Sequence, residues 1–196
     1  MEQLLDTDLI KLAKQGEGRA FDILVQRYQQ KITAFVMRYV RNPDVALDVV
    51  QNIFFKIYRN LSHFKGDAKF SSWLYRIASN QCIDHLRRQK HRPEISLDTY
   101  LESASEPDSL HAGEETYEET LEGKERMEQV RQALGNMPEN MRLVLILKVY
   151  QELTFEQISE ITGEPLSTVK SRLYKALNTL GGLVKQNDFI QQRGLK

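Results

Sequence analysis

A set of hydroxyl, aromatic and basic side chains near residue 170 has a spacing suited to binding duplex DNA. An apolar stripe of helical period runs from Val169 to Leu180 and leaves polar side chains on the opposite face. Small hydroxyls let a helix approach the major groove closely, while Lys and Arg reach guanines and phosphates. The residues predicted to face DNA are Ser167, Thr168, Lys170, Ser171, Arg172, Tyr174 and Lys175. The alternative is an ordinary helical hairpin with a solvated basic face.

A shorter helix before this surface is predicted to hold it in place. Thr154 followed by Gln157 is a capping-box pattern that starts this helix. Gly163 suits the left-handed position past a helix end, and the proline two residues later cannot continue a helix. A hydroxyl residue, Ser167 or Thr168, is predicted to cap the second helix. The two helices and their tight turn form a predicted helix–turn–helix.

A second cluster of basic and aromatic residues lies in the first half of the chain. The loop over residues 63–71 contains two Phe, two Lys and one Gly, and it leads into a helix predicted to end in basic residues near 92. Bases of single-stranded nucleic acid stack on aromatic rings while Lys and Arg hold the phosphates. The alternative is that Phe64, Phe70 and Trp73 are core residues, and the sequence favours a core position for Trp73.

Three further helices are predicted before residue 62, from apolar residues at three- and four-residue steps. The first has Leu5, Leu9 and Leu12 on its apolar side. Asn42 or Asp44 is predicted to start the third, because the Asn-Pro pair ends the helix before it.

The polar ridge of the third helix includes Asp44 and Asp48, a pair that could bind metal or act in acid/base catalysis. No other potential ligand is spaced to join them. The sequence also lacks a Gly-rich phosphate loop, a zinc-ligand spacing and a Ser/His/Asp order, and its four His are scattered. We therefore expect a protein that is not an enzyme and holds no cofactor, with this ridge either solvated or docked on a partner.

The formal net charge is zero, but the charges are segregated along the chain. Residues 94–125 contain eleven acidic residues and one basic residue, which leaves 26 basic against 16 acidic residues elsewhere. Two basic bodies joined by an acidic linker favour polyanion binding by the bodies. Cys82 is the single cysteine, and neither a signal peptide nor an apolar run of membrane-spanning length is evident. We therefore expect a cytoplasmic protein.

The predicted architecture is all-α, with two small helical domains. In the second domain a helix returns at about Arg126, and Pro138 is predicted at the first turn of the next helix, which is apolar nearly all round and therefore central. After Gly181 and Gly182 the tail is polar and predicted to fray. The predicted boundaries are 1–92 for the first domain, 93–125 for a flexible linker, 126–184 for the second domain and 185–196 for the tail.

Three stretches, Asp44–Tyr58, Phe70–Arg88 and Leu153–Leu177, resemble regions 2.2, 2.3–2.4 and 4.2 of the bacterial extracytoplasmic-function (ECF) sigma factors of the sigma-70 family. The order of the stretches is that of the family, and the resemblance covers the chain from about Leu9 to Leu180. It implies a region 2 helical bundle, an acidic linker and a region 4 helix–turn–helix, in a subunit that gives RNA polymerase its promoter specificity.

The resemblance also implies three groups of site residues. The region 4.2 helix would read the minus-thirty-five element through the residues between Ser167 and Lys175 that are predicted above to face duplex DNA. The contacts with the β′ clamp helices of core RNA polymerase would be Asp48, Gln51, Asn52 and Phe55. The residues that recognise and melt the minus-ten element would be Phe64, Lys65, Gly66, Lys69, Phe70, Ser71, Trp73, Arg76, Asn80, Arg87 and Arg88.

The chain departs from the family pattern at a few of these positions. Family members usually have Glu where this chain has Asn52, and primary sigma factors have a second Trp where it has Leu74. Several relatives have Arg in place of Lys170 and Lys175. Because Lys lacks the bidentate fork of Arg, base discrimination at these two positions is expected to be softer.

The partners that the resemblance implies are core RNA polymerase, including its β flap, promoter DNA and a cognate anti-sigma factor, which in this family is often membrane-bound and released by envelope stress. The acidic linker would occupy the basic channel of the polymerase.

A LuxR-type or response-regulator-like protein that binds DNA alone also ends in a helix–turn–helix. Such a protein needs a preceding domain with strand patterns, whereas residues 1–92 show helical periods only. An anti-sigma or adaptor protein would not need the basic, Ser-lined helix.

Overall fold

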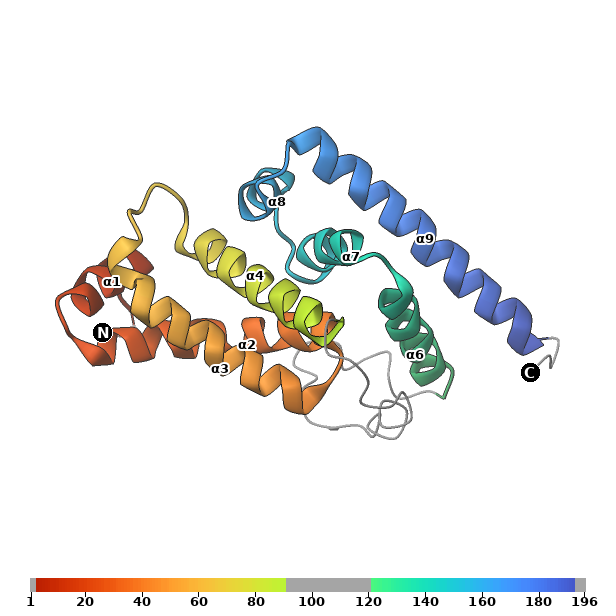
Figure 1. The fold of residues 1–196 in the computed structure, drawn as a ribbon, viewed down its shortest axis with the longest axis horizontal. Coiled ribbons are helices and arrows are strands. Elements are labelled where there is room, and N and C mark those ends of the chain that lie inside the picture. The colour runs from red at the N-terminus through yellow and green to blue at the C-terminus, as the bar shows by residue number, and fades with distance from the viewer. Residues whose placement is uncertain (1–2, 91–120, 193–196) are drawn as a thin grey trace.

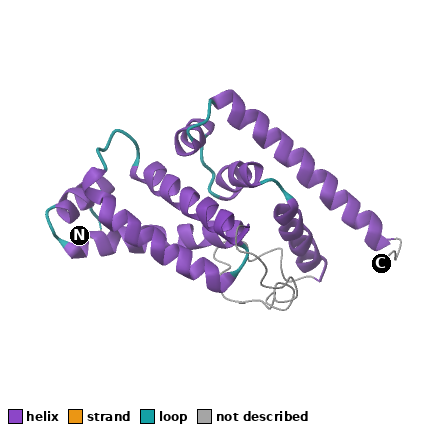
Figure 2. Ribbon diagram, viewed as in Figure 1, coloured by secondary structure: helices purple, strands orange, loops and turns teal. Residues whose placement is uncertain are grey.

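The structure is a computed structural model that describes residues 3–90 and 121–192, with side chains described for residues 3–89 and 127–182. The secondary structure of these described residues consists of helices without any strand, as Figure 2 shows. Two groups of helices lie side by side (Figure 1), one formed by α1–α4 and the other by α6–α9. This confirms the all-α fold class. Most of the predicted linker, 93–125, lies outside the described residues.

The first helix group contains α1 (Asp6–Lys14), α2 (Gly18–Val40), α3 (Pro43–Asn60), a short 3-10 turn η1 (Leu61–His63) and α4 (Phe70–Lys90). Helix α2 packs against α1, α3 and α4. Its apolar side buries Leu24, Ile32 and Phe35 completely or nearly so, against Ile53 of α3 and Leu74 of α4. Leu24, Ile32 and Phe35 lie eight and three residues apart, which places them on one face of an amphipathic helix.

Local signals set the ends of these helices. Asn42 is the N-cap of α3, with its side chain accepting a hydrogen bond from the Val45 backbone at 3.1 Å, as predicted for one of the two candidates. Arg41 ends α2 in the left-handed conformation at φ 65°. The prediction that Leu5 belongs to the apolar side of α1 is wrong, because Leu5 is the extended residue before the helix and is 70% exposed. Leu9 and Ile10 fill that side instead.

The second helix group contains α6 (Leu121–Asn136), α7 (Glu139–Leu145), a π-helical stretch η2 (Ile146–Tyr150), α8 (Phe155–Thr162) and α9 (Leu166–Gln192). The five consecutive apolar residues from Leu143 to Leu147 are all buried. This confirms the prediction of a central apolar helix. The long helix α9 packs across α6, α7 and α8 (Figure 1).

The structure corrects three predicted helix ends in this group. Helix α6 begins at Leu121 rather than at about Arg126, since the helix-forming sequence around Gly123 tolerates one glycine at a cost of about 1 kcal/mol. For the same reason α9 continues through Gly181 and Gly182 to Gln192, so the prediction of a frayed tail after residue 182 is wrong. Pro138 is the N-cap of α7 and not its first helical residue.

The start of α9 also differs from its prediction. The backbone N–H of Val169 donates to the Pro165 carbonyl at 3.0 Å, so the helix begins at Leu166 and neither Ser167 nor Thr168 caps it. The proline carbonyl already accepts the first helical hydrogen bond, which places both hydroxyl residues inside the first turn.

Within the described residues, no helix combines the length and the apolar character needed to cross a membrane. The described side chains likewise place no three His, Cys, Asp or Glu where they could hold a metal ion together.

Candidate nucleic-acid interface

Helices α8 and α9 form the predicted helix–turn–helix. Thr154 and Gln157 make the complete capping box: the Gln157 backbone N–H donates to Thr154 Oγ1 at 3.2 Å, and the Thr154 N–H donates to Gln157 Oε1 at 2.8 Å. Gly163 ends α8 at φ 70°, with its N–H donating to the Ser159 carbonyl at 2.9 Å. These confirmed signals fix the two ends of α8, and so they set where the chain turns into α9.

A side-chain hydrogen bond and an ion pair stabilise the turn between the two helices. Ser159 Oγ donates to the Glu164 carbonyl at 2.5 Å. Arg172 of α9 pairs with the Glu164 carboxylate through both terminal nitrogens, at 3.1 and 3.3 Å. Because Arg172 was predicted to contact DNA, this ion pair is a finding that the sequence did not suggest. In this structure the Arg172 guanidinium positions the turn against α9.

The outward face of α9 brings together most of the residues predicted to read duplex DNA. Val169, Leu173 and Ala176 are buried against the rest of the group and fix the rotation of the helix. Thr168 and Arg172 are half-buried, and Leu177, which was predicted to belong to the apolar stripe, is 42% exposed. The exposed members of the predicted set are Ser167, Lys170, Ser171, Tyr174 and Lys175. They form one continuous polar and basic surface.

Three aromatic residues of the first helix group form a cluster around the start of α4. The ring centroids of Phe64, Phe70 and Trp73 lie 5.1 to 5.8 Å apart. Phe64 and Phe70 are buried, whereas Trp73 is half-buried at the margin of the core. Lys14 donates to the Phe64 carbonyl at 2.5 Å and thereby ties the loop to α1. The structure thus favours the core interpretation for the two Phe rings, which support the loop from below.

The exposed part of this region is polar. In the loop, Lys65, Gly66 and Lys69 are exposed, and Gly66 has φ 85°, a conformation that L side chains rarely adopt. On α4, Trp73, Arg76, Asn80 and Arg87 fall at steps of three, four and seven residues and therefore share one face. Ser71 is half-buried, and Arg88 is exposed beside this face with its Nε donating to the Asp84 carbonyl at 3.2 Å.

A third surface lies along α3. The four predicted polymerase contacts, Asp48, Gln51, Asn52 and Phe55, are all exposed. Phe55 is 61% exposed, and the Asn52 side chain donates to the Asp48 carbonyl at 2.8 Å. Sequence analysis missed Leu47, which is 51% exposed and lies one and two turns before Gln51 and Phe55. The sequence did contain a signal for Leu47, because residues 47, 51 and 55 are spaced four apart and therefore share one face of a helix.

A shallow hollow adjoins this surface where α3 meets α4. Its lining includes Asn52, Phe55 and Arg59 of α3, together with His63 and Gln81. The Arg59 guanidinium lies 5.7 Å from the centre of the Phe55 ring. Exposed apolar side chains with a polar rim are typical of a surface that docks a protein partner.

Two family models match the chain, sigma-70 region 2 over residues 24–92 and sigma-70 region 4 over residues 127–180. The RNA polymerase sigma-H factor of Pseudomonas aeruginosa is 36% identical over 178 residues, covering 90% of this chain and 92% of its own length. The ECF RNA polymerase sigma-E factor of Escherichia coli is 36% identical over 185 residues, covering 94% of this chain and 96% of its own length. The chain belongs to the ECF sigma factors of the sigma-70 family.

Solved structures show the same fold as this sigma factor. The structure of CnrH in complex with the cytosolic domain of CnrY matches with a TM-score of 0.67 and 23% identity, covering 92% of this chain and 97% of that one. The sigma factor RpoE of Bartonella quintana, solved in complex with the anti-sigma factor NepR, matches with a TM-score of 0.64 and 21% identity, covering 84% and 96%. The family-model matches place sigma-70 region 2 within the α1–α4 group, over residues 24–92, and sigma-70 region 4 within the α6–α9 group, over residues 127–180.

Three ionisable groups of α4 that pack against the core are neutral near pH 7. Burial raises the pKa of Tyr75 and that of the Cys82 thiol to about 12. Burial, with a smaller contribution from Arg88, lowers the pKa of His85. His85 Nε2 is buried without a hydrogen-bond partner among the described residues, which is consistent with a ring that stays uncharged.

We expect His85 to make the stability of region 2 depend on pH. Its pKa is lower in the folded state than the usual 6.5, so the unfolded chain binds this proton first. Folding with a neutral His85 ring costs no free energy above pH 6.5, where the unfolded chain is also neutral at this residue. As the pH falls below 6.5 toward the folded-state pKa, the unfolded chain takes up the proton first and the free energy of unfolding decreases. Urea unfolding between pH 7.5 and 5 should show a steeper loss for the wild type than for His85→Gln. Parallel curves would contradict this account.

Proposed function

We propose that this sigma factor binds core RNA polymerase through the exposed surface of α3 and directs initiation from promoters that carry a matching pair of elements. The observation that supports this most strongly is the occurrence of two exposed basic faces, one on α4 and one on α9, in regions 2 and 4 of the same chain. One chain can then recognise two promoter elements, each with its own helix.

In this proposal α9 reads the minus-thirty-five element in the major groove. Lys170 and Lys175 provide the positive charge, and Ser167 and Ser171 allow close approach to the backbone. Tyr174 is 61% exposed, and it offers an aromatic ring and a hydroxyl to the groove. Arg172 contributes by holding Glu164, and so it orients the turn rather than reading a base.

The minus-ten element would be bound by the loop before α4 and by its outward face. A base that leaves the stack costs a few kcal/mol, which a protein pocket must offset. Asn80 and the exposed edge of Trp73 lie on one face of α4, where they can contact such a base while Arg76 and Arg87 bind phosphates. The buried Phe64 and Phe70 rings give this site a rigid base.

We further propose the regulatory setting of the family for this chain. A cognate anti-sigma factor, in many family members membrane-bound, would mask the sigma factor in the cytoplasm until an envelope stress releases it. The chain itself would not insert into the membrane or catalyse a reaction. Most of the acidic segment proposed to lie in the polymerase channel falls outside the described residues.

The polymerase contact can be tested with Phe55→Ala. Truncating an exposed aromatic anchor should weaken binding of fluorescently labelled sigma factor to core RNA polymerase about tenfold or more, with no change in thermal unfolding. Leu5→Ala is the matched control, because Leu5 is 70% exposed and lies just before α1, away from the α3 surface. Equal binding by Phe55→Ala and the wild type would place the polymerase contact elsewhere.

A further inference from the structure

Helix α1 lies beside the proposed minus-ten site, although no binding residue was predicted on it. The family model for region 2 begins at residue 24, after α1 has ended. Even so, α1 packs against α2 and touches η1, the turn from which the chain enters the loop over residues 64–69 (Figure 1). This minus-ten loop leads into α4 and carries the exposed Lys65 and Lys69 of the proposed site.

Lys14, the last residue of α1, binds the start of the minus-ten loop. Its ammonium donates to the Phe64 carbonyl at 2.5 Å and lies 6.0 Å from the centre of the Phe64 ring. A hydrogen bond from a charged donor is stronger than one between neutral groups, and a cation at the C-terminal end of a helix complements the helix dipole. Because Phe64 is buried and Lys65 is exposed, Lys14 holds the point at which the chain leaves the core.

The other end of α1 supports the end of the loop through Tyr28 of α2. Asp6, the first residue of α1, forms an ion pair with Arg27 at 2.7 Å and accepts a hydrogen bond from the Tyr28 hydroxyl. Burial and the bond to Asp6 raise the pKa of Tyr28, so the hydroxyl remains a donor. The Tyr28 ring packs edge-on against Phe70, the first residue of α4, with the two centroids 5.5 Å apart.

One helix thus supports both ends of the minus-ten loop. Helix α1 is itself fixed, because Leu9 and Ile10 are buried in the core of the first helix group. The two supported rings, Phe64 and Phe70, both pack on Trp73, at centroid distances of 5.1 and 5.8 Å. A shift of either ring therefore reaches the half-buried Trp73, which borders the proposed DNA-binding face.

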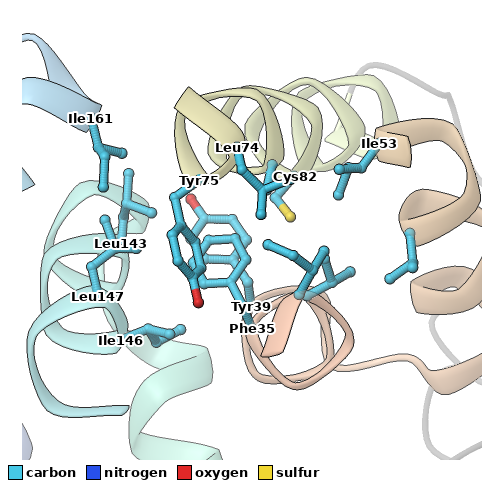
Figure 3. Packing of buried hydrophobic residues seen from close by; sticks show 14 of the residues in the cluster. Phe35, Tyr39, Ile53, Leu74, Tyr75, Cys82, Leu143, Ile146, Leu147 and Ile161 are labelled. Carbon is cyan, nitrogen blue, oxygen red and sulfur yellow. The ribbon is translucent and has the colours of Figure 1, made fainter. Parts of the chain in front are cut away.

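The body of α4 is anchored independently of α1. Leu74 and Cys82 are completely buried, and Figure 3 shows them in the core together with Ile53 of α3. Releasing the contact of Lys14 should leave these core contacts in place and loosen only the loop and the aromatic cluster in front of α4. Positioning of the loop can therefore be tested without unfolding the first helix group.

We propose that α1 positions the minus-ten loop, with Lys14 as the main positioning residue and Asp6 acting through Tyr28. The effect on promoter opening rests on the proposed function, whereas the positioning itself does not. A loop already held in its binding conformation loses less conformational entropy when it captures an unpaired base. Loss of the Lys14 contact should therefore slow promoter opening and leave the surfaces on α3 and α9 unchanged.

The positioning is tested in the free full-length chain by the fluorescence of Trp73, the single tryptophan. Acrylamide quenching reports how well the ring is shielded by its neighbours. We expect Lys14→Met to give a larger quenching constant and a red-shifted emission, with unchanged helix content by circular dichroism. Lys14→Arg should restore the wild-type values, because arginine also offers a cationic donor. Lys11→Met is the matched control, since Lys11 is an exposed lysine of the same helix.

Tyr28→Phe acts at the other end of the loop. It removes the hydroxyl that donates to Asp6 and keeps the ring that packs on Phe70. The emission of Trp73 should shift in the same direction as in Lys14→Met. Wild-type quenching in Lys14→Met would overturn the positioning by Lys14, and the same result in Tyr28→Phe would overturn the role of Asp6.

The effect on opening is tested with core RNA polymerase on a promoter that the wild-type chain selects. Permanganate reactivity should show open complexes forming several-fold more slowly with Lys14→Met than with the wild type, Lys14→Arg or Lys11→Met. Equilibrium binding to core polymerase and to a minus-thirty-five duplex should be the same for all four. Increased quenching with a wild-type rate of opening would overturn the role in opening. If even the wild type opens no promoter, the proposed function fails, and the quenching still decides whether α1 positions the loop.

Discussion

Replacing Phe64 with alanine should lower the free energy of unfolding of region 2 by about 3–5 kcal/mol, as is typical for truncating a buried Phe. The ring is 8% exposed and packs against Phe70 and Trp73 at centroid distances of 5.7 and 5.1 Å. Its loss would leave a cavity beneath the loop that carries Lys65 and Lys69. Urea unfolding followed by circular dichroism would measure the effect.

Asn80→Ala separates this structural role from a contact with DNA. Asn80 is exposed on α4, so its truncation should leave the unfolding curve within about 0.5 kcal/mol of the wild type. It should nonetheless slow open-complex formation, measured by permanganate reactivity of the minus-ten element, without changing minus-thirty-five binding. Similar stability of Phe64→Ala and Asn80→Ala would show that the Phe64 ring is not part of the core.

Lys170→Ala should weaken binding to a minus-thirty-five duplex by about 1–3 kcal/mol, which corresponds to roughly 5- to 150-fold. Lys170 is exposed on the outward face of α9, with its ammonium 5.5 Å from the centre of the Phe155 ring. That contact directs the side chain without burying its charge. Fluorescence anisotropy with a specific and a scrambled duplex would distinguish the loss of a base contact from the loss of a phosphate contact.

Two variants serve as controls for Lys170. Lys31→Ala removes an exposed lysine from α2 and should bind the duplex like the wild type. Arg172→Lys keeps the charge but loses the bidentate pair with Glu164, so we expect weaker DNA binding together with lower thermal stability of region 4. Normal binding by Lys170→Ala would mean that a different face of α9 enters the groove.

Much of the fold could be predicted because its signals are local. The Thr154 and Gln157 capping box, the Asn42 cap and the left-handed Gly163 are determined by a few neighbouring residues, and the structure has all three. The central position of α7 followed from a run of apolar residues with no polar face. Periodicity and capping depend on sequence separations of three or four residues, which a single sequence displays directly.

The predictions that failed depended on weak or competing local signals. The tail after Gly181 and Gly182 was expected to fray, but glycine costs a helix only about 1 kcal/mol, and α9 continues through both glycines to Gln192. Ser167 and Thr168 have the chemistry of caps, yet Pro165 takes the position before the helix. A residue type suited to a helix end does not determine which of several adjacent candidates occupies it.

Long-range contacts gave no signal in the sequence. An exposed aromatic and a core aromatic are the same residue type, so Phe64 and Phe70 were open to both interpretations until their neighbours were known. The pairing of Arg172 with Glu164 was hidden in the same way. Arg142 of α7 donates to the Tyr39 carbonyl, more than 100 positions away in the chain, and nothing in the spacing around it indicates a partner in α2.

Run-off transcription tests the central claim most directly. Core RNA polymerase would be incubated with a pooled promoter library, with and without the full-length chain, and the transcripts would be sequenced. The account predicts selective initiation from a small set of promoters that share two elements, only when the chain is present. Absence of promoter-specific initiation, together with a shift of duplex DNA by the chain alone, would contradict it and favour a regulator that binds DNA without polymerase.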